Sequence, residues 1–334
     1  MMRWCGIFLS FLAAALLAAA AAHAQGFDRA TGKQVSDLFN SRTGTARTRM
    51  THAFPEVKLE SVYAIRYKTS GGETKLCTGT QLDSQHVLTA GHCGCGDPST
   101  YVLSNSPDLR QRKQASAVEV GIIGVPILFD QRWCSGGGAF GKDLALLRTS
   151  KVLPPRGDTK LTRTEEGTLP WSNLTTETRV GAGLVAVGYG YTETGEIGRR
   201  MKAEVPVVTR DCAERIWWRY CAPFEEFVLA ADAGSSRPSD SCGGDSGGPV
   251  IAQVWMSEPK ITNVTREVSH DPALVLVGVT SRAAPFAQPY SDQHCGGGGI
   301  YTIISRNSVM SWLSTHGVKF SFLIQYWEKL PENQ

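Results

Sequence analysis

The sequence predicts an all-β protein, and three observations lead to that fold class. The chain has 334 residues, of which 35 are glycine and 16 are proline, two residues that mark frequent turns. From Val57 onward, short runs rich in β-branched and aromatic residues alternate with these turn residues. Apolar residues make up 42% of the chain and charged residues 19%, which is enough for a sizeable core. This pattern favours a sandwich or barrel over βαβ units.

The first 24 residues have the pattern of a secretory signal peptide. Arg3 is the only charge before Asp28, residues 7–22 are apolar or small, and Ala22-His23-Ala24 resembles a cleavage site. A retained membrane span is the alternative, but the strongly apolar part is short for one. We therefore expect a mature protein that begins after Ala24, is secreted or periplasmic, and has no stable membrane association.

The rest of the chain divides into four parts. Residues 25–49 are polar and read as a pro-segment or flexible arm. The polar stretch 154–178 is the best boundary between two β domains of similar size, and 317–334 form a tail. A helix is predicted only over 307–316. The predicted strands are residues 62–67, 85–89, 118–123, 143–147, 180–187, 205–208, 249–255 and 273–279.

Charge and cysteine content narrow the function classes. Lysine and arginine total 34 against 31 aspartate and glutamate, a formal charge of +3 that gives no reason to expect a nucleic-acid partner. Nine cysteines are present, and Cys5 leaves with the signal. The remaining eight are an even number in an exported chain, which predicts a disulfide framework.

Three short segments carry candidate catalytic residues. His92 follows an apolar strand in Thr89-Ala90-Gly91-His92-Cys93, Asp143 opens another strand, and Ser246 lies in the segment Asp240 to Pro249, DSCGGDSGGP. A hydrolase that attacks a carbonyl at neutral pH needs a hydroxyl nucleophile, an imidazole base and a buried carboxylate that holds the imidazole. These residues supply one of each.

On these segments, and on their order of His, Asp and Ser, the chain resembles the trypsin/chymotrypsin family of serine endopeptidases (peptidase S1). The resemblance covers about residues 50–316 and implies two antiparallel six-stranded β-barrels with a C-terminal helix. Barrel 1 would span about 50–165 and barrel 2 about 180–316, with the catalytic cleft between them. It also implies a catalytic triad of His92, Asp143 and Ser246.

The resemblance assigns further roles. The backbone N–H groups of Gly244 and Ser246 would form the oxyanion hole, and Asp245 would pair with a new N-terminal amine after proteolytic activation. The usual Ile-Val-Gly-Gly start is absent, and the expected junction falls near Arg49-Met50 or Arg47-Thr48. The implied disulfides are Cys77–Cys93, Cys212–Cys221 and Cys242–Cys295, which leaves Cys95 and Cys134 as a fourth pair by elimination.

Substrate preference is expected to depend on Asp240, at the base of the primary pocket, where a buried carboxylate favours a substrate Arg or Lys. Ser241, Ser281 and Gly299 would line the same pocket. Where the family usually has Ser-Trp-Gly, this chain has Ser281-Arg282-Ala283, so Ala283 is expected to narrow the pocket and Arg282 to favour acidic residues at a neighbouring subsite.

The sequence thus predicts a secreted, monomeric serine endopeptidase that cleaves after Arg or Lys and has polypeptide substrates and protein protease inhibitors as partners. Chymotrypsin-like or elastase-like preference is one alternative, and a non-catalytic binding protein on the same fold is another. His92-Cys93-Gly94-Cys95 suggests a metal site, but no second cluster with ligand spacing lies nearby. No cofactor and no metal are expected.

Overall fold

A computed structural model describes residues 59–111, 117–155, 178–192, 195–230, 241–255, 272–284 and 298–319, together with short strand segments outside these ranges. The short segments are β1 (Phe27–Asp28), β2 (Lys33–Gln34), β3 (Phe54–Pro55), β11 (Thr162–Thr164), β12 (Gly167–Thr168), β17 (Glu258–Ile261), β18 (Arg266–Ser269) and β21 (Ser321–Phe322). The expected cleavage junction at 47–50 lies outside the described residues, and so does the larger part of the expected domain boundary at 154–178.

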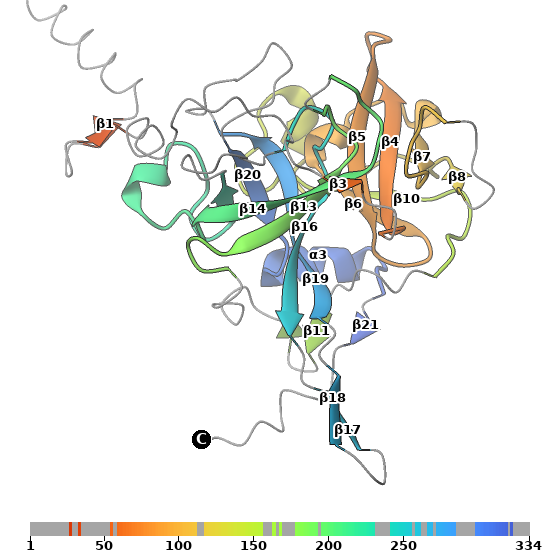
Figure 1. Cartoon of the computed structure of the whole chain (residues 1–334). Coiled ribbons are helices and arrows are strands. Elements are labelled where there is room, and N and C mark those ends of the chain that lie inside the picture. The colour runs from red at the N-terminus through yellow and green to blue at the C-terminus, as the bar shows by residue number, and fades with distance from the viewer. Residues whose placement is uncertain are drawn as a thin grey trace, which may run out of the picture.

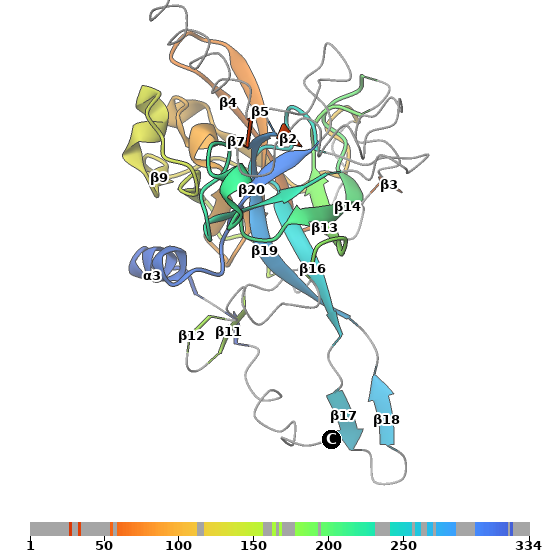
Figure 2. The same cartoon turned by 90° about the vertical axis from the view of Figure 1, so that its left-hand side faces the viewer.

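The first large sheet has seven antiparallel strands in the order β8-β7-β4-β5-β6-β10-β9. Figure 1 labels all of them except β9, which Figure 2 labels. An isolated bridge between Ile122 and Thr149 links the segment after β8 back to the end of β10. The strands of this first sheet are β4 (Val62–Lys68), β5 (Thr74–Gln81), β6 (His86–Thr89), β7 (Val102–Ser104), β8 (Glu119–Val120), β9 (Ile127–Leu128) and β10 (Ala145–Arg148).

The second large sheet closes into a six-stranded barrel. Its order is β13-β16-β19-β20-β15-β14, and β14 also pairs with β13, while β3 adds to the outer edge of β14. Its strands are β13 (Gly183–Gly188), β14 (Met201–Thr209), β15 (Glu226–Leu229), β16 (Pro249–Trp255), β19 (Pro272–Ala283) and β20 (Gly299–Ile303). The predicted all-β class and a closed six-stranded second barrel are confirmed. The first sheet has seven strands rather than six and forms a half-barrel, which is called the first barrel below.

One helix of more than two turns is described, α3 (Asn307–Thr315), one residue shorter than predicted. It follows the second barrel in sequence but packs against the first, since its Val309, Met310 and Leu313 belong to the same core cluster as residues of β4 to β10. Trp312 on α3 meets Phe129 edge to face, with ring centroids 5.2 Å apart. Figure 2 shows α3 beside the sheets.

Buried polar side chains join the two barrels. Arg200, which is 1% exposed and precedes β14, donates hydrogen bonds to the carbonyls of Val62 and Asn105 in the first barrel, at 3.3 and 3.1 Å. The hydroxyl of Tyr189, just after β13, donates to the carbonyl of Ser106 at 2.9 Å. Because a buried donor that loses its acceptor costs free energy, these bonds resist a change in the relative position of the barrels.

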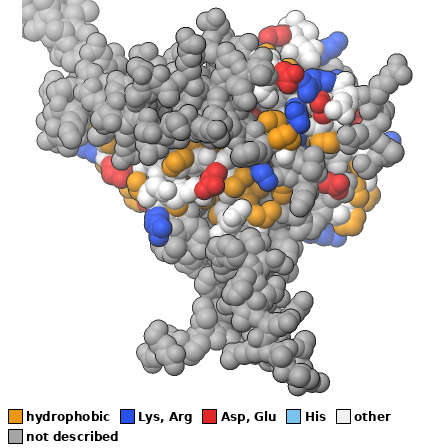
Figure 3. Space-filling model, in the orientation of Figure 1, with side chains coloured by type: hydrophobic (Ala, Val, Ile, Leu, Met, Phe, Trp, Pro, Cys, Tyr) orange, Lys and Arg blue, Asp and Glu red, His pale blue; other side chains and the backbone are white. Residues whose placement is uncertain are grey.

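The exposed face in Figure 3 carries mixed charge. Blue and red side chains are interspersed among hydrophobic ones on the part of that face that is described, in agreement with the near-balance of charge in the sequence. Within the described residues, no helix is long and apolar enough to cross a membrane.

Candidate active site

Strand pairing brings His92 and Asp143 together. His92 lies on the short 3-10 helix η1 (Gly91–Gly94) just after β6, and Asp143 lies two residues before β10. The two strands are antiparallel with Thr89 opposite Ala145, so the residues that follow β6 meet those that precede β10. A Cβ on Gly91 would lie 3.0 Å from Asp143 Oδ1, a tight contact that shows how closely the backbone before His92 approaches the aspartate.

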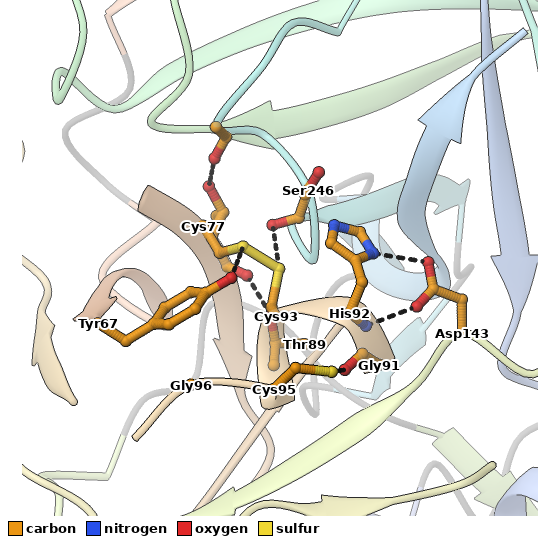
Figure 4. Close-up of a disulfide and its surroundings, with 12 residues drawn as sticks. Tyr67, Cys77, Thr89, Gly91, His92, Cys93, Cys95, Gly96, Asp143 and Ser246 are labelled. Carbon is orange, nitrogen blue, oxygen red and sulfur yellow. Dashed lines mark hydrogen bonds and ion pairs between the residues drawn. A yellow bond between two sulfur atoms is a disulfide. The ribbon is translucent and has the colours of Figure 1, made fainter. Parts of the chain in front are cut away.

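Asp143 is 1% exposed and accepts three hydrogen bonds. His92 donates to it twice, from Nδ1 to Oδ2 and from the backbone N to Oδ1, both at 2.9 Å (Figure 4). The Ser281 hydroxyl donates to Oδ2 at 2.6 Å. Burial alone would raise the pKa of Asp143, but the hydrogen bonds and the charge of His92, with Ser281, bring that pKa below its ordinary value. The arrangement holds a carboxylate against Nδ1 and leaves Nε2 for a reaction.

Ser246 lies beside the His92 ring, and both line one groove of about 370 Å³ (Figure 4). Its backbone carbonyl accepts from the N–H of Thr78 on β5 at 2.8 Å, and the next residue, Gly247, donates to Thr280 on β19 at 2.7 Å. Within the described residues, no hydrogen bond joins the Ser246 hydroxyl to His92. Such catalytic bonds are often long in proteins without substrate.

The glycines of the serine loop have conformations that a side chain disfavours. Gly244 has φ +98°, and a Cβ there would lie 2.8 Å from the Cα of Gly190. Gly247 has φ +82°. The Thr78 hydroxyl donates to the Gly244 carbonyl at 2.9 Å. The backbone N–H groups of Gly244 and Ser246 make no hydrogen bond to another described residue.

Asp245, between the two expected oxyanion donors, is also 1% exposed but has different partners. Its carboxylate accepts from the backbone N–H groups of Gly190 and Cys242, both at 2.7 Å. No cationic side chain of the described residues pairs with it. Burial therefore dominates and raises the pKa of Asp245 to about 7.

The expected pocket is described in part. Asp240 and Cys295 lie outside the described residues. Gly299 begins β20 opposite Ala283, and a Cβ on Gly299 would lie 2.6 Å from the Tyr301 hydroxyl and 3.0 Å from the Ser241 Oγ. Ser241 and Tyr301 are themselves hydrogen-bonded at 3.0 Å. The hydroxyl of Ser281 donates to Asp143, and the expected place of Ser281 in the pocket stays a prediction.

Arg282 differs from the expectation that its charge favours acidic substrate residues. Its guanidinium forms a bidentate ion pair with Glu226, at 2.6 and 2.8 Å, and Glu226 is fully buried. Because this carboxylate already neutralises the guanidinium, little of its charge is left for a substrate. Sequence reasoning missed Glu226, and one of two adjacent glutamates at the start of a strand carries no pattern by which it could have been found.

Three disulfides are described: Cys77–Cys93, Cys95–Cys134 and Cys212–Cys221. These are three of the four expected pairs, and Cys242 is also disulfide-bonded. Ligand atoms of Cys77, His92 and Cys93 lie within 4.8 Å of one another, but the two sulfurs are bonded together and are not thiolates that a metal could bind. The Cys95–Cys134 bond ties η1 to η3 (Gln131–Ser135), whose Trp133 ring lies 6.3 Å from that of His92.

Comparison with known proteins identifies related chains. Phenoloxidase-activating factor 1 of Holotrichia diomphalia is 30% identical over 205 residues, which are 57% of this chain and 54% of that protein. Serine protease grass of Drosophila melanogaster is 27% identical over 59% of this chain and 53% of its own length. Human chymotrypsin-like elastase family member 3A is 25% identical over 62% of this chain and 73% of its own length.

The chain spans about half the length of the first two of these relatives. The family model described as Trypsin matches residues 55–309, most of the chain and nearly all of both barrels. The chain therefore belongs to the trypsin family.

Proposed function

We propose that the chain is an exported serine endopeptidase that cleaves peptide bonds through an acyl-enzyme formed on Ser246. The observation that carries this proposal is the buried carboxylate of Asp143 bonded to His92 Nδ1, with Ser246 on the open side of the same imidazole. This is the arrangement that a hydroxyl nucleophile needs for activation at neutral pH.

The chemistry follows from these positions. Ser246 Oγ attacks the carbonyl carbon while His92 Nε2 takes its proton, and the same nitrogen later donates that proton to the leaving amine. Asp143 keeps the proton of His92 on Nδ1 and stabilises the imidazolium that forms. The N–H groups of Gly244 and Ser246 would stabilise the oxyanion, an effect worth roughly 3–4 kcal/mol for one donor.

Activation by cleavage is part of the proposal. Asp245 has a buried carboxylate, and an amine delivered by cleavage near Arg49-Met50 or Arg47-Thr48 would give that carboxylate a cationic partner. The resulting ion pair would hold the loop that carries Gly244 and Ser246. N-terminal sequencing of active protein tests this step, and full activity of a chain that still carries residues 25–49 would contradict it.

For substrate preference we propose cleavage after Arg or Lys. Asp240 stands six residues before Ser246, and Gly299 leaves the space beside Ser241 free of a Cβ. Asp240→Ser should lower turnover of Arg and Lys amides by about 10²- to 10⁴-fold, since it removes one partner of a buried ion pair. An unchanged ratio of Arg to Phe amide turnover would contradict this preference.

Covalent labelling tests the catalytic proposal directly. A fluorophosphonate should add to Ser246 of the activated chain, as measured by intact mass and peptide mapping, and Ser246→Ala and His92→Ala should abolish the addition. Ser305→Ala is the matched control, because its buried hydroxyl has no hydrogen-bond partner in the described part of the chain. An activated chain that neither takes up the label nor cleaves amides would instead be a non-catalytic protein on this fold.

A further inference from the structure

The ion pair between Glu226 and Arg282 stands behind the triad aspartate, away from the reacting atoms. Glu226 opens β15 and Arg282 lies near the end of β19, so both belong to the second barrel. The Glu226 side chain has no exposed surface, and that of Arg282 is 23% exposed. The ring of Phe140, from the first barrel, covers the guanidinium at 4.1 Å. A charge so deeply buried is maintained only where it is fully partnered.

The partners of Glu226 reach the first barrel. Besides Arg282, its carboxylate accepts from the backbone N–H groups of Ala222 and Gly141, both at 2.8 Å. Gly141 lies two residues before Asp143, so Glu226 holds the loop that carries the triad aspartate. The Gly141 carbonyl is held as well, because it accepts from Arg306. Both backbone hydrogen-bonding groups of Gly141 are thus bound, one by Glu226 of the second barrel and the other by Arg306 just before α3.

Arg282 reaches Asp143 by a second route. Its Nη1 donates to the Ser281 Oγ at 3.2 Å, and the Ser281 hydroxyl donates to Asp143 Oδ2 at 2.6 Å. A guanidinium has no acceptor, so the hydroxyl proton of Ser281 is directed to the carboxylate. A chain of donors that begins on a cation polarises each bond in turn.

We propose that the Glu226–Arg282 ion pair is a positioning device that fixes Asp143 from two sides, through Ser281 and through Gly141, and thereby sets the His92–Asp143 hydrogen bond. Glu226 and Arg282 are positioning residues, since neither touches the reacting atoms. This inference rests on the proposed function, because the position of Asp143 affects catalysis only in a working triad.

The first experiment separates positioning from a purely structural role. Arg282→Met should lower kcat for an Arg amide by about 10- to 100-fold, the range expected for losing a hydrogen bond to a charged group, with KM within about threefold of wild type. It should also destabilise the protein, because Glu226 is left buried without its cation. Arg66→Met is the matched control, since the Arg66–Glu119 pair is exposed.

The double variant Arg282→Met with Glu226→Gln keeps the test valid if the single variant does not fold. It leaves no unpaired buried charge at the site of the ion pair, so its melting temperature should return toward that of wild type. Its kcat should stay low, because Ser281 still lacks its donor. A double variant with wild-type kcat would overturn the proposal, and so would a change confined to KM, which would assign Arg282 to substrate contact.

A second readout does not depend on catalysis. The proton between His92 Nδ1 and Asp143 should give a low-field NMR resonance in wild type and in Arg66→Met, and that resonance should broaden or move upfield in the double variant. An unchanged resonance in the double variant would overturn the proposal. If wild type shows the resonance but cleaves no amide and takes up no fluorophosphonate, the proposed function fails. The effect of the double variant on the resonance still decides whether the ion pair positions Asp143.

Discussion

Asp143 and Asp245 are two aspartates with the same burial and opposite behaviour. Each is 1% exposed, yet the pKa of Asp143 lies below the ordinary value and that of Asp245 is raised to about 7. Asp143 faces an imidazole and a hydroxyl, whereas Asp245 faces two backbone N–H groups and no described cation. The comparison shows that the partners of a buried carboxylate, rather than its burial alone, decide its charge.

The largest expected effect is on kcat and comes from replacing the carboxylate of Asp143. Asp143→Asn should lower kcat by about 10⁴-fold, a loss of the size attributed to the wrong histidine tautomer in Ser-His-Asp triads of this family. Steady-state hydrolysis of an Arg amide measures it, with Ser246→Ala as the background. A loss below tenfold would show that Asp143 does not control the imidazole.

Asp245 should affect stability in a pH-dependent way. The pKa of Asp245 is higher in the folded protein than in the unfolded chain. Its contribution to the free energy of unfolding is therefore fully present below about pH 4 and is lost as pH rises toward 7. Asp245→Asn should therefore gain stability over the wild type across this window, by about 4 kcal/mol at most, in a chain not cleaved at 47–50. Melting curves at pH 4 to 8 measure the difference. A difference that does not vary with pH would mean that a cation already holds Asp245 ionised.

The Ser281 hydroxyl bonds to Asp143, and Asp245 has no such hydroxyl partner. Replacing Ser281 tests what this hydrogen bond contributes. Ser281→Ala should lower kcat by about 10- to 100-fold, as expected for a hydrogen bond to a charged group, and should leave KM nearly unchanged. Ser305→Ala again serves as the control, with no expected change in kcat. Equal kcat values for the two variants would remove Ser281 from the support of the triad.

Asp83 gives the smallest effect and extends the comparison to a carboxylate away from the groove. Burial would raise the pKa of Asp83. Its carboxylate accepts hydrogen bonds from His86 Nδ1, at 2.9 Å, and from the backbone N–H groups of Lys319 and Gln85, and together these bonds lower that pKa. The contribution of Asp83 to stability is present above its pKa in the unfolded chain and is lost as pH falls through its pKa in the folded protein. Asp83→Asn should cost about 1 kcal/mol near pH 7 and nothing in strong acid, with unchanged kcat. Chemical denaturation at pH 7 and pH 2.5 measures this cost.

Some strands were predictable from runs of apolar and β-branched residues, and others were not. The strand predicted at 249–255 matches β16, and the one predicted at 62–67 is one residue shorter than β4. In contrast, β5 was missed, because its Thr-Lys-Leu-Cys-Thr-Gly-Thr-Gln sequence lacks apolar alternation. Thr78 and Gln81 of β5 are nonetheless buried, since their polar atoms bond to the Gly244 and Pro154 carbonyls. Only the tertiary fold supplies such acceptors.

The sequence by itself determined the all-β class and the family resemblance, and it made His92, Asp143 and Ser246 the candidate catalytic residues, because the glycine-rich serine loop and the His-Asp-Ser order are local and specific. Only the tertiary structure decided what supports them. Glu226, Gly141 and Arg282 are far apart in sequence, and they meet because two barrels pack together and a buried carboxylate must find its partners there. The opposite pKa shifts of Asp143 and Asp245 have the same origin, since a carboxylate's surroundings do not exist until the chain has folded.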